Sequence, residues 1–292
     1  MSQFDMTVRL RPAVVVDADA CGHVIYAAFK DVDERHGFTS LFTSVPQATH
    51  VAKLFIELAS LHGIVADDDG RVLGSVFLDE GDPIKSVALI SVDPACQRQA
   101  IGRRLMQAAI ARAGDARGVR LVQEAFNTHA MGLYASLGFE VKEPLVSMMG
   151  RPPGLPPAGT TSRAITTADL DECAALCRRV HAVDRTVDLQ DAIKLFTPTA
   201  LVRDGRIVAY SYLVYGGSLA WGVAESHDDL EALLLVLGAA ASAPLRFNVP
   251  TRDTRLFHWC LEHGMRIDRP LTLMARGWYQ EPRGSWFPSG FY

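Results

Sequence analysis

The chain has 292 residues, a formal net charge of −4, and 49% hydrophobic against 21% charged residues. This length suggests about two domains, and the composition argues against a disordered chain. A net charge this close to zero gives no reason to expect nucleic acid or an anionic membrane as a partner, so the substrates are expected in a pocket.

Periodicity and turn signals predict an alternation of strands and helices in the first half. In chain order, these are a strand over 8–16, a helix over 17–33, a helix over 49–60, paired strands over 63–67 and 72–78, a strand over 86–92, a helix over 102–113, a strand over 119–125, a helix over 129–137 and a strand over 139–148. The order predicts an α+β fold, with a mixed, mostly antiparallel twisted sheet flanked by helices.

A proline- and glycine-rich segment separates two halves of the chain. Residues 150–159 read Gly-Arg-Pro-Pro-Gly-Leu-Pro-Pro-Ala-Gly, which neither a helix nor a central strand can cross. We therefore predict four parts, namely a first domain over 1–150, a linker over 151–161, a second domain over 162–277 and an aromatic tail over 278–292.

The two halves resemble each other at two places in the same order. The segment 69–78, Asp-Gly-Arg-Val-Leu-Gly-Ser-Val-Phe-Leu, matches 204–213, and the segment 138–148 matches 264–274 with glycine, proline, leucine and methionine at identical spacing. Two matches in register predict a duplicated domain.

The segment between the strand over 86–92 and the next helix predicts an anion site. The strand ends at Asp93-Pro94, a short polar loop follows, and the helix begins near Gly102. Amide groups at a helix start lack partners and lie at the positive end of the helix dipole. Small residues let a ligand approach the backbone, and Arg98, Arg103 and Arg104 add positive charge, so a pyrophosphate would suit this site.

This segment resembles the acyl-CoA signature of the GNAT superfamily of N-acyltransferases, Gln/Arg-x-x-Gly-x-Gly/Ala. The six positions here read Gln97-Arg98-Gln99-Ala100-Ile101-Gly102, with Ala100 where glycine is usual. A second stretch, Asn127 to Phe139, resembles the later GNAT motif Asn…Ala-x-x-x-Tyr-x-x-x-Gly-Phe. The resemblance covers residues from about 7 to 150 and implies two GNAT-like domains once the repeat is included.

GNAT enzymes transfer an acyl group directly from the thioester of CoA to an amine, so the resemblance implies acetyl-CoA as co-substrate and no metal. It also implies that Tyr134 protonates the departing thiolate. The implied cofactor-binding residues are Ile90, Ser91 and Val92 for the pantetheine, Gln97, Arg98, Gln99, Ala100, Ile101, Gly102 and Arg103 for the pyrophosphate, and Asn127 and Tyr134 near the cofactor arm.

Each of these roles has a structural alternative. Tyr134 could be a core tyrosine, and Asn127 could cap the following helix. Cys96 lies beside the loop, but direct transfer needs no nucleophile. The five cysteines contain no Cys-x-x-Cys pair, which favours buried thiols in a reducing cytosol over a zinc site.

A general base for the incoming ammonium is expected among a few acids and one histidine. The candidates are Asp79, Glu80, Asp82, Glu124 and His129. Glu124 lies on a strand next to the cofactor strand and is named with Tyr134 as catalytic. The run that holds Asp79 and Asp82 is also an ordinary solvated turn.

The acceptor pocket is predicted to involve Phe38 and Phe42 with Asp79 and Asp82, although residues 34–42 also fit a packed connection between helices. We predict an N-acetyltransferase acting on a primary amine of a small molecule. A protein lysine or N-terminal acetyltransferase and a non-catalytic CoA- or ligand-binding module remain as alternatives. The protein is expected to be cytoplasmic, without nucleic-acid or membrane partners, and a monomer or homodimer.

The second half repeats the strands but not the chemistry. Its loop at 224–231, Ala-Glu-Ser-His-Asp-Asp-Leu-Glu, has no glycine and is acidic, and Cys260 stands where the first half has Tyr134. An acidic helix start would repel a pyrophosphate. The second copy is therefore predicted to be a degenerate GNAT-like domain, and the aromatic tail is predicted to fold back across a domain interface.

Overall fold

The computed structural model describes residues 8–97, 99–212 and 220–290. The chain divides by compactness into unit 1, residues 1–81 and 85–119, and unit 2, residues 82–84 and 120–292. The predicted domains follow the sequence repeat instead of this division by compactness, and their boundaries stay a prediction.

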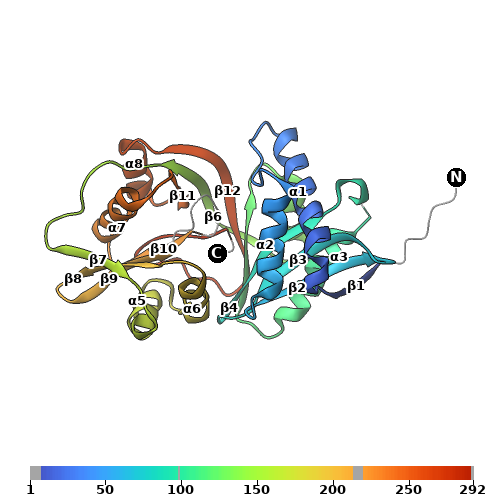
Figure 1. Ribbon diagram of the computed structural model, residues 1–292, viewed down its shortest axis with the longest axis horizontal. Helices are drawn as coiled ribbons and strands as arrows, with labels where there is room; N and C mark the ends of the chain where they lie inside the picture. The colour runs from blue at the N-terminus through green and yellow to red at the C-terminus, as the bar shows by residue number, and fades with distance from the viewer. Residues whose placement is uncertain (1–7, 98, 213–219, 291–292) are drawn as a thin grey trace. The chain divides into compact units, whose positions relative to one another are not determined.

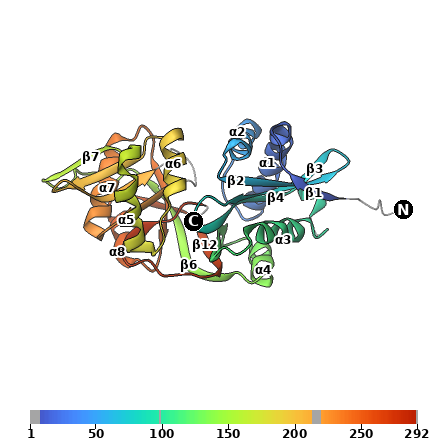
Figure 2. The same ribbon diagram turned by 90° about the horizontal axis from the view of Figure 1, so that it is seen from below.

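Unit 1 contains a sheet with helices on both faces. Its strands β1 (Arg9–Pro12), β2 (Leu61–Asp68), β3 (Arg71–Asp79) and β4 (Ile84–Val92) lie in this order, each antiparallel to the next. The helices α1 (Ala18–Arg35) and α2 (Val45–Glu57) lie side by side on one face, and α3 (Ile101–Ala113) covers the other (Figure 1, Figure 2). The alternation of strands and helices predicted this α+β arrangement correctly.

Two predicted boundaries in unit 1 are wrong, and local hydrogen bonds explain both. The first strand ends at Pro12, because the amide of Val14 donates to Asp17 and turns the chain into a short helix at Val15–Asp17. The helix α2 begins four residues earlier than predicted, because the side chain of Ser44 accepts a hydrogen bond from Gln47 N.

The Asp-Gly turns of the two copies take the same conformation. Asp69 and Gly70 have φ of 49° and 89°, and Asp204 and Gly205 have φ of 51° and 75°. Positive φ at both central residues is the turn that joins tightly paired antiparallel strands. The predicted turn between β2 and β3 is therefore confirmed, and it recurs between β8 (Thr199–Arg203) and β9 (Arg206–Tyr212).

The start of each copy is held by the same ion pair. Arg11 donates two hydrogen bonds to Asp17, of 2.7 and 2.8 Å, and Arg163 does the same to Asp169, at 2.8 and 2.7 Å. Both aspartates are buried at the entrance to a long helix. Paired, fork-shaped contacts of this kind fix orientation as well as distance, and here they join the first strand of each copy to its first helix.

Unit 2 contains two groups of strands. In one, the order is β5 (Gly118–Glu124), β12 (Arg266–Gly277), β6 (Glu140–Gly150) and β11 (Leu245–Pro250). In the other, the order is β13 (Ser285–Phe287), β10 (Trp221–Ala224), β9, β8 and β7 (Thr160–Ala164). The helices of this unit are α4 (Thr128–Ser136), α5 (Leu170–His181), α6 (Thr186–Leu195), α7 (His227–Ala240) and α8 (Thr254–Glu262).

The two copies of the repeat exchange their last strands. The second copy's β12 lies between β5 and β6 of the first copy, and β6 in turn lies beside β11 of the second. The junctions are symmetric, since Ala125 N donates to Pro270 O at 3.1 Å and Thr251 N donates to Pro144 O at 3.0 Å. This pairing agrees with a duplicated chain whose copies complete each other's sheets.

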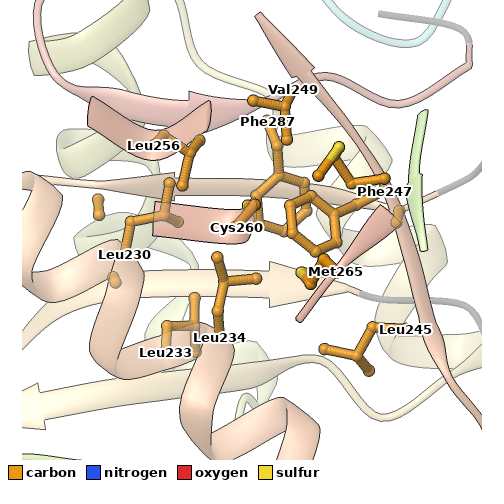
Figure 3. Close-up of a cluster of buried hydrophobic side chains, with 14 of the residues drawn as sticks. Leu230, Leu233, Leu234, Leu245, Phe247, Val249, Leu256, Cys260, Met265 and Phe287 are labelled. Atoms are coloured by element: carbon orange, nitrogen blue, oxygen red, sulfur yellow. The ribbon is translucent and has the colours of Figure 1, made fainter. Parts of the chain in front are cut away.

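The core of the second copy includes the tail. In Figure 3, leucines of α7, side chains of α8 and Phe247 of β11 surround Phe287 of β13. The rings of Phe247 and Phe287 lie 4.8 Å apart, and Phe287 is fully buried. The prediction that the tail folds back is confirmed for residues 278–290, whereas Phe291 and Tyr292 lie outside the described residues.

Candidate functional site

The predicted phosphate loop follows the end of β4 in unit 1. Asp93 accepts a hydrogen bond from Ala95 N at 2.9 Å and forms an ion pair with Arg71, also at 2.9 Å. These contacts end the strand and start the short helix Pro94–Cys96. Earlier in β4, the pairing with β3 shifts between Leu89 and Val87, so the strand carries a bulge there. A bulge bends its strand, and bulges are frequent beside functional sites.

Ala100 adopts the left-handed conformation, with φ 61° and ψ 7°, and stands at the N-cap of α3. The N-cap alanine makes no side-chain cap, and a backbone bond runs from Arg104 N to Ala100 O at 3.0 Å. The amides of Ile101, Gly102 and Arg103 belong to the first turn, at the positive end of the helix dipole. The backbone takes the conformation for which glycine is usual at this position, despite the alanine.

The structure describes two of the three arginines near the loop. Arg104 donates to the backbone oxygen of Val8 at 2.8 Å, so its guanidinium is bound to the start of the chain. Arg103 lies in the first turn of α3. Arg98, which was predicted to contact the pyrophosphate, lies outside the described residues.

Cys96 is buried beside the loop, and burial raises the pKa of its thiol. The carboxylate of Asp93 adds to this effect. A thiol with a raised pKa stays protonated near neutral pH and is a poor nucleophile. This agrees with the expectation that transfer is direct.

Asn127 immediately precedes α4 and Tyr134 lies on it, both in unit 2. Asn127 Oδ1 accepts from Ala130 N at 3.1 Å, so this residue caps the helix, which is the structural alternative foreseen for it. Tyr134 is buried, with its ring 6.3 Å from that of Phe139, and burial raises its pKa well above the usual range. Its hydroxyl therefore retains the proton that a general acid must carry.

Glu124 closes β5, three residues before Asn127. Its Oε1 accepts a hydrogen bond from Arg269 Nη1 at 2.8 Å, and the side chains of Glu124 and Arg269 are only 12% and 4% exposed. Arg269 belongs to β12 of the second copy, and sequence reasoning did not single it out. The available signal was the repeat itself, because Arg269 stands where the first copy has Glu143.

The residues predicted for the acceptor pocket occupy structural positions. Both oxygens of Asp82 accept amides at the start of α6, from Val187 and Asp188 at 3.0 Å each. Asp79 accepts from Gly81 N in a turn. Phe42 is buried against Phe29, with ring centroids 5.2 Å apart, whereas Phe38 is half-buried. That these four residues contact a substrate stays a prediction, and it competes with the structural contacts just described.

The corresponding helix start in the second copy is closed. Ser226 Oγ accepts from Asp229 N, and Asp229 binds Arg203 at 2.6 Å. Arg255 pairs with Asp228 and Glu231 in the first turns of α7. The free side of β10 is paired with β13 from the tail. Side chains of the protein thus occupy the helix start, and the strand β13 occupies the edge of β10.

Neither a metal centre nor a membrane span is found in the described part of the chain. No group of three or more His, Cys, Asp or Glu side chains among residues 8–97, 99–212 and 220–290 is arranged to hold a metal ion. Within the same ranges, no helix is long and apolar enough to cross a membrane.

Comparison with known proteins finds similarity to acetyltransferases, most specifically within the first copy. Residues 59–141 match the family model described as acetyltransferase (GNAT) domain. The uncharacterized N-acetyltransferase YitH of Bacillus subtilis is 24% identical over 206 residues, which cover 68% of this chain and 72% of that protein.

Solved structures with the same fold extend over both copies. A proposed acetyltransferase of Pyrococcus horikoshii matches with a TM-score of 0.76 at 15% identity, covering 99% of this chain and 95% of that one. A tandem GNAT protein from the clavulanic acid biosynthesis pathway matches with a TM-score of 0.57 at 14% identity, covering 92% and 98%. Over more than nine-tenths of its length, this chain therefore has the same two-copy fold as these two proteins.

Proposed function

We propose that this chain, a GNAT-type acetyltransferase with the duplicated arrangement of tandem GNAT proteins, acetylates a primary amine of a small molecule. The GNAT family uses acetyl-CoA as the acetyl donor. The observation that carries the proposal is the start of α3 behind the left-handed Ala100, with no acidic residue in its first turn, which lies within the matched residues.

The residues present at the loop fit a pyrophosphate. The first turn of α3 contains the amides of Ile101, Gly102 and Arg103 behind an alanine N-cap, and no acidic residue lies in that turn. An anion at such a helix start is stabilised by the amides and by the dipole. The proposal also assigns Gln97, Arg98 and Gln99 to the pyrophosphate and the backbone of Ile90, Ser91 and Val92 to the pantetheine.

Two residues of the chain transfer the protons in the proposed reaction. Glu124 accepts one proton from the acceptor ammonium, and the free amine attacks the thioester carbonyl. The new N–C bond forms as the C–S bond breaks, Tyr134 donates its proton to the departing thiolate, and the second proton of the amine restores Tyr134. The products are the acetamide and CoA thiol, and the proton on Glu124 passes to solvent.

The Tyr134→Phe variant tests the catalytic role. We expect kcat to fall by about 10²-fold or more, as is typical for loss of general acid catalysis, with little change in the Kd for acetyl-CoA. Thiol release is measured against a panel of primary amines, and Tyr26→Phe, which removes a phenol from α1, is the matched control. Binding of acetyl-CoA without turnover by the wild type on any amine would contradict the enzyme proposal.

The proposal includes one acetyl-CoA per chain, bound to the first copy. It is supported by the closed helix start at Ser226 and by the pairing of β10 with β13. Calorimetric titration with acetyl-CoA is expected to give a stoichiometry of one. Two sites would mean that the second copy also binds the cofactor, and no binding at high micromolar concentration would remove the proposed function.

The proposal places the enzyme in the cytoplasm, without a metal. The five cysteines are free and buried, which suits a reducing compartment. A monomer or a homodimer is compatible with the proposal.

A further inference from the structure

The ion pair between Glu124 and Arg269 joins the catalytic segment of the first copy to the last strand of the second. Glu124 O accepts the amide of Asn127 at 2.9 Å, which leads into the helix of Tyr134. Arg269 is part of a longer series of charges on unit 2. Its Nε donates to Asp268 at 3.2 Å, and Asp268 accepts from Arg246 of β11 at 2.5 Å.

A bulge in β12 accounts for the direction of Arg269. The pairing of β12 with β6 skips from Ile267 to Arg269, so Asp268 is the inserted residue. In a regular strand, neighbouring side chains point to opposite faces, whereas a bulge re-aims one of them. The bulge therefore lets Asp268 and Arg269 contact each other while Arg269 also reaches Glu124.

The pair is not a general consequence of the repeat. When the two copies are aligned on the symmetric junctions at Pro144 and Pro270, Glu143 corresponds to Arg269, and Glu124 corresponds to Pro250. The equivalent site of the second copy therefore has no carboxylate at the strand end, and Glu143 there binds Tyr279 and Arg252. The contact of a buried arginine with a strand-end carboxylate therefore occurs in the copy that carries the predicted phosphate loop.

Stability alone gives a weak reason to keep this pair. Removing two charged side chains from water costs about as much as their attraction returns, and apolar residues of similar volume stabilise a core equally well. A paired arginine does, however, fix the direction of a carboxylate. A residue that takes a proton from one particular group of a substrate needs a fixed direction.

We propose that Arg269 of the second copy is the positioning residue for Glu124, orienting the carboxylate that receives the ammonium group of the acceptor. The inference rests on the proposed function, which it deepens. It gives the second copy a direct part in the acetyl transfer, although its own cofactor site is closed.

The test compares wild type, Arg269→Met, Arg269→Lys, Glu124→Gln and the Glu124→Gln/Arg269→Met double variant. Steady-state kinetics use acetyl-CoA and the primary amine of the panel with the fastest thiol release. Arg269→Met is expected to lower kcat/KM for the amine by about 10- to 100-fold, mainly through KM, with the Kd for acetyl-CoA unchanged. Arg269→Lys keeps the charge without the fork and is expected to recover part of the loss.

The double variant separates positioning from packing. If Arg269 acts through Glu124, the double variant has the same kcat/KM as Glu124→Gln alone. Because the pair is removed as a whole, this variant is also expected to fold if Arg269→Met does not. Arg252→Met, which removes the ion pair between Arg252 and Glu143, is the matched control and is expected to leave the kinetics unchanged.

Three outcomes would overturn the inference, and the third is distinguishable from the first two. Unchanged amine kinetics in a folded Arg269→Met variant, or additive losses in the double variant, would overturn the positioning role while leaving the proposed function intact. Absence of thiol release by the wild type with every amine would remove the proposed function and this inference together.

Discussion

Ala100 adopts the left-handed conformation, which is unfavourable for alanine. A left-handed residue with a Cβ costs about 1 kcal/mol more than glycine, and part of this is offset because glycine loses more backbone freedom on folding. The φ of 61° at Ala100 shows that the turn into α3 needs this conformation. The departure from the usual glycine is therefore a local energetic cost and not a change in the path of the loop.

The Ala100→Gly variant is expected to be more stable by about 0.5–1 kcal/mol and to bind acetyl-CoA at least as tightly. Urea denaturation and calorimetry measure the two effects. Ala182→Gly is the matched control, because Ala182 also has a positive φ, of 60°, at the end of α5. It should gain similar stability without any change in binding, and a loss of stability in both variants would contradict the argument.

Asp169 links stability to pH. The hydrogen bonds from Arg163 lower the pKa of Asp169 from 3.8 to about 2. A lowered pKa means that the ionised group stabilises the folded chain above pH 4 and that this contribution is lost as the pH falls from about 4 to about 2. Because Arg163 is half exposed, we expect about 1–2 kcal/mol at neutral pH instead of the full shift.

The Asp169→Asn variant should therefore lose about 1–2 kcal/mol at pH 7, and its difference from the wild type should shrink at lower pH. Urea denaturation between pH 7 and pH 3 measures this. The exposed neighbour Asp171→Asn serves as the control and should change stability by about 0.5 kcal/mol or less. A difference that stays constant with pH would contradict the role of the ion pair.

The short strand β13 covers the edge of β10 in the second copy. It pairs with β10 at Gly222, Val223 and Ala224, and a Cβ at Gly222 would lie 2.4 Å from the ring of Phe287. The tail is therefore packed against the strand as tightly as a core element. In the second copy, this element occupies the edge of β10.

Phe287→Ala is expected to destabilise the protein by about 3–5 kcal/mol and to make the tail sensitive to protease, because it empties a fully buried site. Denaturation and limited proteolysis check the two effects. Glu281→Ala, at an exposed tail position paired with Arg252, should cost under about 1 kcal/mol. A Phe287→Ala variant with the stability of the wild type would show that the tail does not support this core.

The exchanged last strands make the two copies interdependent. The strand β12 has β5 and β6 of the first copy as its neighbours, so a chain cut at the linker leaves both of these strands without that neighbour. Unpaired backbone groups and an uncovered apolar strand favour aggregation over folding. A sequence repeat therefore does not imply two copies that fold separately.

Residues 1–150 expressed alone are expected to aggregate or to expose apolar surface, and co-expression with residues 151–292 is expected to restore a stable complex. Solubility, size-exclusion chromatography and binding of acetyl-CoA to the co-purified pair measure this. A monomeric 1–150 fragment that folds and binds acetyl-CoA would contradict the interdependence and would support the predicted first domain as an autonomous unit.

The sequence determined the features that depend on neighbours along the chain. The elements of the first half, the Asp-Gly turns, the loop before α3 and the family resemblance all rest on local patterns, and the structure or the family match agrees with them. The start of α2 was missed only because the cap at Ser44 lies outside its apolar period.

Only the tertiary structure decided which distant residues meet. The insertion of β12 between β5 and β6, the contact of Arg269 with Glu124, and the use of Asp82 to cap α6 join positions far apart in the chain. A local pattern carries no information about these pairings, because strand register and side-chain direction follow from long-range packing and from bulges such as the one at Asp268.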